Sequence, residues 1–462
     1  MDRDSLNSGL LLLVWIILTP PGGQSAEPLS RAGGGRIIFV GDSITGQGGG
    51  WQNAGFVFQM RDALGATDPD PTPELVPLGG SGMGVGAWLG LLNQPDKQSR
   101  YLDVKGVEVG TSLSKPADVL VVMLGMNDLL APYVQDSDES LDRWKADYQK
   151  VLDALEKRLH PKITALATIT PQTEDPGTPK NQVEARMNER IRALANERKA
   201  LLLPTHATYW EVLKEARQRQ STFTLAGDRI HPNQAGHIAV AMAMLKGLGE
   251  DPAAAWLREA RWKPILDGLT PVAAPPQPPP WLVTSGLILK GWQEAPATED
   301  LVPNPIDLAI QRGEDFTQAP SHEGGSPLSW RPFQSGIHLT DGTNPDSVDF
   351  AGITFGRNFE AGYGARWIRC ETSQPVKLAM KASGVGSVSH LTVWLNGVAV
   401  YTGMLTSEPK RQATRDTMLR AGWNVLVFKS CHRTWQWQQS ISVTRPDGTP
   451  PAELEIRGEP PP

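Results

Sequence analysis

The sequence predicts a three-layer α/β domain followed by a separate all-β sandwich. Three observations lead to this prediction. From Arg36 to about Gly249, short apolar runs alternate with stretches of helical periodicity, as in layered α/β domains. Residues 271–280 read PVAAPPQPPP, which is typical of a stiff, extended spacer. Beyond the spacer the helical periodicity disappears, and short strand-like runs alternate with turn residues.

Length and composition agree with this division. The chain has 462 residues, 40% hydrophobic and 20% charged, which is ordinary for a globular protein of about two or three domains. Forty-four Lys and Arg against 50 Asp and Glu give a net charge of −6, so we expect no nucleic-acid partner. Two cysteines are too few for a disulfide scaffold or a four-thiolate zinc site.

The N-terminus reads as a secretory signal peptide over residues 1–26. Leu10 to Leu18 form an unbroken apolar run that is too short to span a bilayer, because a spanning helix needs about 20 apolar residues. Small residues follow, so we expect cleavage near Ala26 and an exported protein, periplasmic or extracellular. The charged residues before the run lack the usual positive excess, which leaves an uncleaved membrane anchor as the alternative.

The α/β domain is expected over residues 34–250. Its apolar runs are short and rich in β-branched residues, as in parallel strands buried on both faces. These runs cover residues 37–40, 75–78, 119–124, 163–169 and 201–203. Apolar residues at spacings of three and four predict a helix over 141–159, capped by Asp136, and another over 183–194. A final helix is expected from Pro232 to about Leu248.

The linker is expected at residues 268–281 and the β-sandwich at 282–456. Its strand-like runs cover residues 365–372, 376–381, 391–395, 398–401 and 424–428. The W-L-N-G hairpin at 394–397 and the strand after Gly422 resemble the accessory jelly-roll modules of carbohydrate-active enzymes. Trp435 and Trp437 alternate along the chain and either fill the core or stack on sugar rings. The sequence leaves open whether Cys370 and Cys431 form a disulfide.

A serine stands where a nucleophile is expected. The first predicted strand runs into Gly41-Asp42-Ser43-Ile44-Thr45, and ligands of open α/β sheets bind at the carboxyl ends of the strands. A serine hydroxyl needs an adjacent base, which in turn needs an orienting acid. The segment D-R-I-H supplies both, because a carboxylate three residues before an imidazole can reach its Nδ1 side. We therefore predict a catalytic triad of Ser43, His231 and Asp228, with His206 and His237 as alternative bases.

Donors for an oxyanion follow the next two predicted strands. The loop G-G-S-G-M-G at 79–84 can present bare backbone N–H groups, and G-M-N-D at 125–128 offers an amide side chain. An acyl-transfer site needs such donors aimed at the developing oxyanion. We predict an oxyanion hole made by the N–H of Ser43, the N–H of Gly82 and the side chain of Asn127. Gly79 or Gly80 can take the place of Gly82.

The same loops suggest substrate contacts and exclude nucleotides. The two glycine-dominated segments expected around the nucleophile carry few large apolar side chains, namely Trp51, Met83 and Val85, and we take Trp51 and Met83 as candidate substrate contacts. The glycines at 46–50 lack the Gly-Lys-Ser/Thr ending of a phosphate loop, so nucleotide binding is not expected. No His, Asp or Glu cluster has metal-ligand spacing, so we expect neither a metal nor a cofactor.

These four blocks, in this order, resemble the SGNH hydrolase superfamily, the GDSL-type esterases and lipases. The blocks are G-D-S-I-T at 41–45, a glycine at 82, G-M-N-D at 125–128 and D-R-I-H at 228–231. The resemblance covers residues 36–249. It implies a flavodoxin-like three-layer domain with a five-stranded parallel sheet, a Ser-His-Asp triad, and hydrolysis of an ester or thioester without a metal.

The sequence therefore favours an exported serine esterase that removes short acyl groups, above all acetyl, from an acylated carbohydrate. The glycine-dominated loops around the predicted nucleophile favour a short acyl group. One alternative is a lipolytic esterase, lysophospholipase or thioesterase acting on longer acyl chains. Another is a carbohydrate-binding or cell-surface protein whose hydrolase domain is idle. The oligomeric state is not predicted.

Overall fold

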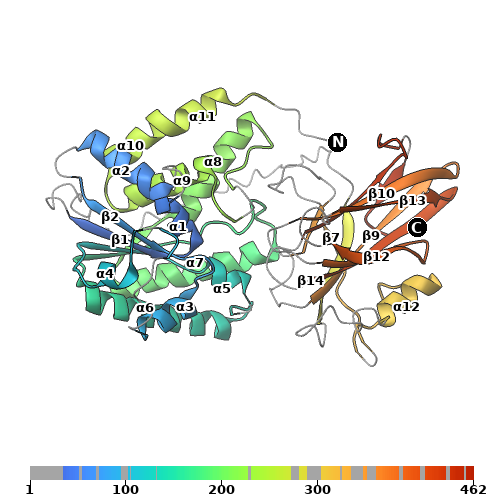
Figure 1. Ribbon diagram of the computed structural model, residues 1–462, viewed down its shortest axis with the longest axis horizontal. Helices are drawn as coiled ribbons and strands as arrows, with labels where there is room; N and C mark the ends of the chain where they lie inside the picture. Colours follow the sequence, from blue (N-terminus) through green and yellow to red (C-terminus); the bar gives the residue numbers. More distant parts are fainter. Residues whose placement is uncertain are drawn as a thin grey trace, which may run out of the picture.

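The computed structural model contains an α/β unit, residues 35–271, and a β unit, residues 280–461 (Figure 1). The described residues are 35–50, 55–68, 72–94, 102–104, 106–131, 133–226, 230–271, 280–288, 303–322, 325–333, 347–350, 360–383, 389–405, 412–432, 438–451 and 454–461. The expected signal peptide and most of the proline-rich linker lie outside them. In this described part, no helix has the length and apolarity needed to cross a membrane.

Five parallel strands form the centre of the α/β unit, in the order β2-β1-β3-β4-β5. They are β1 (Arg36–Gly41), β2 (Glu74–Gly79), β3 (Val119–Met123), β4 (Ile163–Ala167) and β5 (Leu201–Leu203). Each strand lies on one of the predicted apolar runs, and the order is that of flavodoxin-like folds, so the predicted fold class is confirmed. The order reverses at β1, and ligands bind at the carboxyl ends of the strands beside such a reversal.

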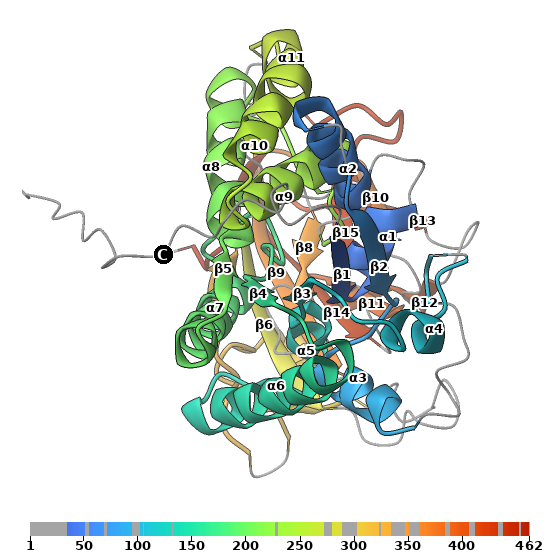
Figure 2. The ribbon, with the colours of Figure 1, turned by 90° about the vertical axis from the view of Figure 1, so that its left-hand side faces the viewer.

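Two helical layers cover the sheet (Figure 2). One layer consists of α1 (Ser43–Gly50), α2 (Phe56–Thr67), α8 (Thr205–Arg219), α9 (Gln234–Gly247), α10 (Asp251–Leu257), the π-helical segment η3 (Arg258–Trp262) and α11 (Lys263–Gly268). The other consists of α3 (Val85–Leu92), α4 (Val109–Leu113), α5 (Met126–Leu130), α6 (Asp138–Leu159) and α7 (Pro179–Arg198). In β1, Phe39 packs against the first layer and Val40 against the second, so both faces of the strand are apolar.

Two predicted helix starts are wrong. Ser137, and not Asp136, caps α6, because its hydroxyl accepts a hydrogen bond from the N–H of Ser140 at 3.2 Å. Asp136 pairs instead with Arg186 of α7. The last predicted helix, α9, begins at Gln234 rather than Pro232, because the side chain of Asn233 accepts from Gly236 and caps the helix.

The α/β unit continues past its expected end at residue 250. Leu257, Trp262 and Leu266 are buried in the same core as α2 and α9. Gly249, with a φ of 82°, and Pro252 interrupt the helical periodicity and so suggest a boundary in the sequence. Pro252 only begins the next helix, where a proline costs nothing because the first N–H groups of a helix have no intrahelical partner.

The β unit is a sandwich of two antiparallel sheets, as predicted. The smaller sheet has the order β13-β10-β15-β8, and the larger has β12-β11-β14-β9-β6-β7, with β16 pairing β9. The strands are β6 (Trp281–Ile288), β7 (Arg331–Phe333), β8 (Ser347–Asp349), β9 (Glu360–Cys370), β10 (Gln374–Ser383), β11 (Ser389–Leu395), β12 (Val398–Leu405), β13 (Gln412–Leu419), β14 (Gly422–His432), β15 (Gln438–Thr444) and β16 (Glu455–Arg457). Side chains of both sheets share one core.

A helix covers the outer face of the larger sheet. This helix, α12 (Pro305–Arg312), lies in a segment without clear strand or helix signals in the sequence. Its apolar side chains form a second core with residues of β9, β11 and β14. A buried ion pair at 2.8 Å joins Asp307 of α12 to Lys429 of β14, and the hydroxyl of Tyr363 donates to the same carboxyl group. The sheet is therefore covered on both faces.

The two cysteines of the β unit are too far apart to bond, and three of its tryptophans lie in the core. Cys370 lies opposite Gly422 in the β9–β14 pair, and Cys431 lies at the other end of β14. At about 3.3 Å per residue the two are roughly 30 Å apart, and a disulfide needs Cα atoms within about 7 Å, so they form no bond with each other. Trp281, Trp367 and Trp394 are buried core residues. The region of Trp435 and Trp437 lies outside the described residues.

Candidate active site

The structure brings Ser43 and His231 together at the carboxyl end of β1. Strand β1 ends at Gly41, and α1 begins two residues later with Ser43 itself. The Ser43 hydroxyl lies 2.8 Å from Nε2 of His231, although 188 residues separate the two in sequence. Both side chains are partly exposed, so a substrate can reach them. The backbone N–H of Ser43 is at the first turn of α1, where N–H groups have no intrahelical acceptor and can serve an oxyanion.

His231 is held just before α9. Ala226 and Pro232 form an isolated β-bridge, and the N–H of Asn233 donates to the carbonyl of Leu225 at 2.7 Å. These bonds close the base of a loop that carries His231. Asp228, the predicted third member of the triad, belongs to the part of this loop outside the described residues, so its role stays a prediction.

The two alternative histidines have other environments. His237 is buried in α9 and stacked on Phe56, and burial lowers its pKa to about 3. His206, at the start of α8, lies 3.3 Å from Glu184 and accepts a hydrogen bond from Trp210. Within the described residues, the histidine that bonds the Ser43 hydroxyl is His231.

Gly82 occupies a turn that suits a backbone donor. The N–H of Met83 donates to the carbonyl of Gly80 at 3.1 Å, and Gly82 inside this turn has a φ of 74°, which favours glycine. Gly82 is exposed. Gly79 is packed against α1, where a Cβ would lie 2.1 Å from the backbone nitrogen of Gly46. The turn therefore favours Gly82 over Gly79 as the second donor, which stays a prediction.

Asn127 is oriented by the same loop. Its Nδ2 donates one hydrogen to the carbonyl of Met83 at 3.2 Å, which leaves the second amide hydrogen available. This bond identifies Nδ2 rather than Oδ1 as the atom facing the loop. The side chain of Met83, a candidate substrate contact, is 6% exposed and belongs to the core beneath the loop. Its position favours a structural role, while Trp51, the other candidate, lies outside the described residues.

Two buried carboxylates support these loops. Asp42 accepts from the N–H of Ile44 at 2.9 Å, and both oxygens of Asp128 accept from the N–H of Val85, at 3.1 and 3.0 Å. Burial raises the pKa of Asp42 to about 7 and that of Asp128 to about 6, against the opposing effect of these hydrogen bonds. The sequence pattern gave neither residue a separate role. The only feature of the sequence that could have pointed to them is their position, because Asp42 directly precedes Ser43 and Asp128 directly follows Asn127.

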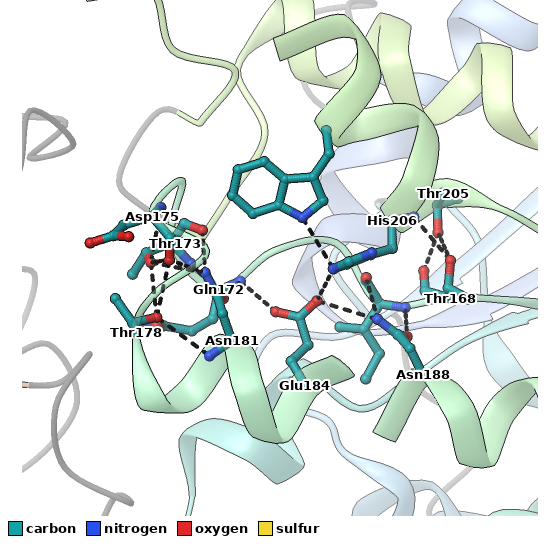
Figure 3. A network of polar contacts seen from close by, with 12 residues as sticks. Thr168, Gln172, Thr173, Asp175, Thr178, Asn181, Glu184, Asn188, Thr205 and His206 are labelled. Carbon is teal, nitrogen blue, oxygen red and sulfur yellow. Dashed lines mark hydrogen bonds and ion pairs between the residues drawn. The ribbon is translucent and has the colours of Figure 1, made fainter. Parts of the chain in front are cut away.

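A polar network surrounds the end of β4 (Figure 3). Glu184 of α7 is fully buried and accepts from the N–H of Gln172 at 2.8 Å and from Nδ2 of Asn188 at 3.3 Å. Burial raises the pKa of Glu184 well above its usual range and lowers that of His206 to about 4. His206 is therefore uncharged near neutral pH, and burial favours the uncharged form of Glu184. The network fixes the loop that follows β4 against α7 and α8.

The described residues contain no group of three His, Cys, Asp or Glu side chains able to hold a metal ion. The chemistry that the described site supports is that of a serine nucleophile with a histidine base and adjacent hydrogen-bond donors. These are the parts of an acyl-transfer site.

Comparisons with known proteins show what the α/β unit is similar to. The sequence profile of the GDSL-like lipase/acylhydrolase family matches residues 39–239. An acetylxylan esterase from Geobacillus stearothermophilus is 27% identical over 241 residues, which are 49% of this chain and 97% of that protein. A solved structure of a catalytic mutant of an acetylxylan esterase from the same organism is 25% identical and covers 48% of this chain and 96% of its own, with a TM-score of 0.36.

A second solved structure, an α/β hydrolase enzyme from the metagenome of Lake Arreo in Spain, is 27% identical and covers 47% of this chain and 96% of its own, with a TM-score of 0.35. All four predicted motif blocks fall inside the residues that the family profile matches. The α/β unit therefore belongs to the SGNH hydrolase superfamily, as a GDSL-like lipase/acylhydrolase domain that hydrolyses esters with a serine nucleophile.

Proposed function

We propose that this protein is an exported esterase that removes acetyl and other short acyl groups from carbohydrate. The observation that carries the proposal is the 2.8 Å contact between the Ser43 hydroxyl and Nε2 of His231. A base at this distance can take the hydroxyl proton as the oxygen attacks a carbonyl carbon. The acetylxylan esterase that resembles the α/β unit over almost its whole length supports carbohydrate as the substrate class. Export rests on the apolar run Leu10–Leu18.

The reaction proceeds in two steps. Ser43 attacks the acyl carbon while His231 takes its proton, and His231 then gives that proton to the departing sugar hydroxyl. Water, activated by the same histidine, releases the acyl group from Ser43 as a carboxylic acid. Asp228 orients the imidazole in this scheme. The backbone N–H groups of Ser43 and Gly82 and the amide of Asn127 stabilise the oxyanion in both steps.

The exposed apolar side chains of the described residues support a short acyl chain. A long chain needs an extended apolar groove, because each buried methylene contributes about 0.8 kcal/mol. In the described part of the chain, the large apolar side chains that are well exposed are Tyr133, Val398 and Met418. Of these, Tyr133 alone belongs to the α/β unit, three residues after α5, and it is 75% exposed. One exposed aromatic ring can stack on a sugar ring but offers little surface to a fatty acyl chain. Esters of longer acyl chains remain the second candidate substrate.

The test is a chromogenic ester series at fixed pH together with acetate release from acetylated xylan. We expect acetyl esters to be cleaved faster than octanoyl esters of the same leaving group, and acetate to be released from the polymer. A rate maximum at octanoyl or longer chains, with no acetate from xylan, would replace the carbohydrate proposal by the lipolytic one.

Ser43→Ala tests the nucleophile itself. It should retain the fold and lose ester hydrolysis by many orders of magnitude, because the acyl-enzyme can no longer form. Ser114→Ala is the matched control, since Ser114 is exposed and, among the described residues, bonds the Thr111 carbonyl in α4. Turnover close to that of the parent protein in folded Ser43→Ala would reject the serine mechanism. If Ser43→Ala loses ester hydrolysis but the parent protein releases no acetate from xylan, the serine mechanism stands and the proposed substrate is rejected.

A further inference from the structure

Glu174 is a buried carboxylate outside the four motif blocks. It lies in the loop between β4 and α7 and is 3% exposed. Its Oε1 accepts from the N–H groups of Leu225 at 2.6 Å and Ala226 at 2.9 Å, and from the hydroxyl of Tyr209 at 3.1 Å. Its Oε2 lies 2.7 Å from a guanidinium nitrogen of Arg217. One side chain thus connects the loop after β4 to α8 and to the segment that follows α8.

Arg217 extends this connection. It is part of α8, and its Nε donates to the carbonyl of Phe223 at 3.0 Å while its Nη1 donates to the backbone carbonyl of Glu174 at 3.1 Å. Residues 223–226 are therefore held on both sides, by the guanidinium at Phe223 and by the carboxylate at Leu225 and Ala226. The segment has no helix or strand of its own, so these bonds hold it in place together with the burial of Leu225 in the core.

The held segment is the base of the loop that carries His231. Ala226 forms the β-bridge with Pro232, the residue that follows His231. The carbonyl of Leu225 accepts from the N–H of Asn233, and the side-chain amide of Asn233 donates to the carbonyl of Thr224 at 2.9 Å. The contacts that join residues 224–226 to Pro232 and Asn233 are thus made at or beside residues that Glu174 or Arg217 holds. A displacement of residues 223–226 would move His231 relative to Ser43.

We propose that Glu174 is a positioning residue for catalysis, which holds the base of the His231 loop against α8 and so sets the contact between His231 and Ser43. The proposal rests on the proposed serine mechanism. A histidine base works only within hydrogen-bond reach of the hydroxyl, and an error of about 1 Å in such a geometry can cost roughly 10²-fold in rate.

Three substitutions of Glu174 separate its contacts. Glu174→Leu keeps the size and removes every acceptor, so we expect kcat to fall about 10²-fold with little change in KM. Glu174→Gln keeps an oxygen for the N–H groups of Leu225 and Ala226 and should restore kcat to within about tenfold of the parent. Glu174→Asp keeps the charge on a shorter side chain and is the second test if the leucine variant does not fold; it should lower kcat about tenfold.

Glu215→Ala is the matched control. Glu215 also lies on α8 and bonds Arg258 and the indole of Trp262, which packs edge-on against Phe223. Its loss therefore disturbs the packing around α8 and Phe223 but removes no hydrogen bond of Glu174 or Arg217. We expect a lower melting temperature with an unchanged kcat. A second readout is the rate at which a fluorophosphonate labels Ser43, which depends on the histidine and should fall in parallel with kcat in Glu174→Leu.

The outcomes distinguish this inference from the proposed function. A folded leucine or aspartate variant with the kcat and labelling rate of the parent would overturn the positioning role. So would an equal loss of kcat in the leucine and glutamine variants, because the glutamine keeps the loop acceptor. If Ser43→Ala remains active, the serine mechanism fails first. If Ser43→Ala is inactive while every Glu174 variant is fully active, only the positioning role fails.

Discussion

Asn127→Ala should lower turnover much more than substrate affinity. The amide of Asn127 is oriented by its bond to the Met83 carbonyl, and its second hydrogen is one of three proposed oxyanion donors. The oxyanion carries its full charge only near the transition state, so loss of this donor acts on kcat. Removing one such donor typically costs about 10²–10³-fold in rate, or roughly 2.7–4 kcal/mol. The half-buried position of Asn127 suits this range, because water cannot fully replace the amide.

The assay is steady-state hydrolysis of a chromogenic acetate by the full chain. We expect kcat to fall within that range and KM to stay within about threefold of the parent. Ser81→Ala is a suitable control, since Ser81 lies in the Gly80–Met83 turn but bonds outward to Asp103 at 2.9 Å. An unchanged kcat with a raised KM would place Asn127 in substrate binding and would refute its assignment to the oxyanion.

Two further predictions concern stability and domain independence. Burial raises the pKa of Asp42 to about 7, above the usual carboxyl value of about 3.9, so the folded chain binds this proton more tightly than the unfolded chain. The resulting stabilisation is complete below about pH 4 and is lost as pH rises through about 7, a change of at most roughly 4 kcal/mol. Asp42→Asn should therefore gain stability relative to the parent at pH 8 but not at pH 4, as measured by the melting of the helical circular-dichroism signal; an equal difference at both pH values would contradict this. A fragment of residues 27–271 should fold and hydrolyse small esters, because residues 37–266 supply both cores of the α/β unit, and an insoluble fragment would make the β unit part of the catalytic fold.

The sheet of the α/β unit was predictable because its strands are buried on both faces. A strand covered by helices on two sides needs apolar residues at every position, and such runs stand out from the amphipathic helices between them. The expected segment 37–40 is β1 with one residue added at each end. Helix ends were less predictable. A cap depends on which of several polar residues meets a backbone N–H, and Asp136 and Ser137 are equally good candidates in the sequence.

The contact between Ser43 and His231 was predictable for a different reason. Both residues belong to motif blocks, and the carboxyl ends of parallel strands meet at one edge of the sheet. Glu174 and Arg217 belong to no motif, and their pairing depends on how α8 packs against the loop after β4. Charged residues in loops and on helix surfaces are common, so nothing in the pattern separates this buried pair from exposed ones. The residues that support the site, unlike its reacting groups, could be identified only from the structure.

These supports share one physical role. The loops at the carboxyl ends of the strands contain backbone N–H groups that the sheet does not bond, and a buried N–H without a partner costs about 1–3 kcal/mol. In the described residues, four buried carboxyl groups accept from such N–H groups. They are Asp42 after β1, Asp128 after β3, Glu174 after β4, and Glu184, which reaches the same loop from α7. Burial raises the pKa of all four, so each carboxylate is itself costly to keep charged. The cost is offset because one carboxylate can satisfy several donors at once, as Glu174 does, and can therefore hold in one place loops that have no regular structure. A site assembled from loops in this way depends for its geometry on acidic residues that take no part in the reaction, and substitutions of these residues should lower the rate before they unfold the chain.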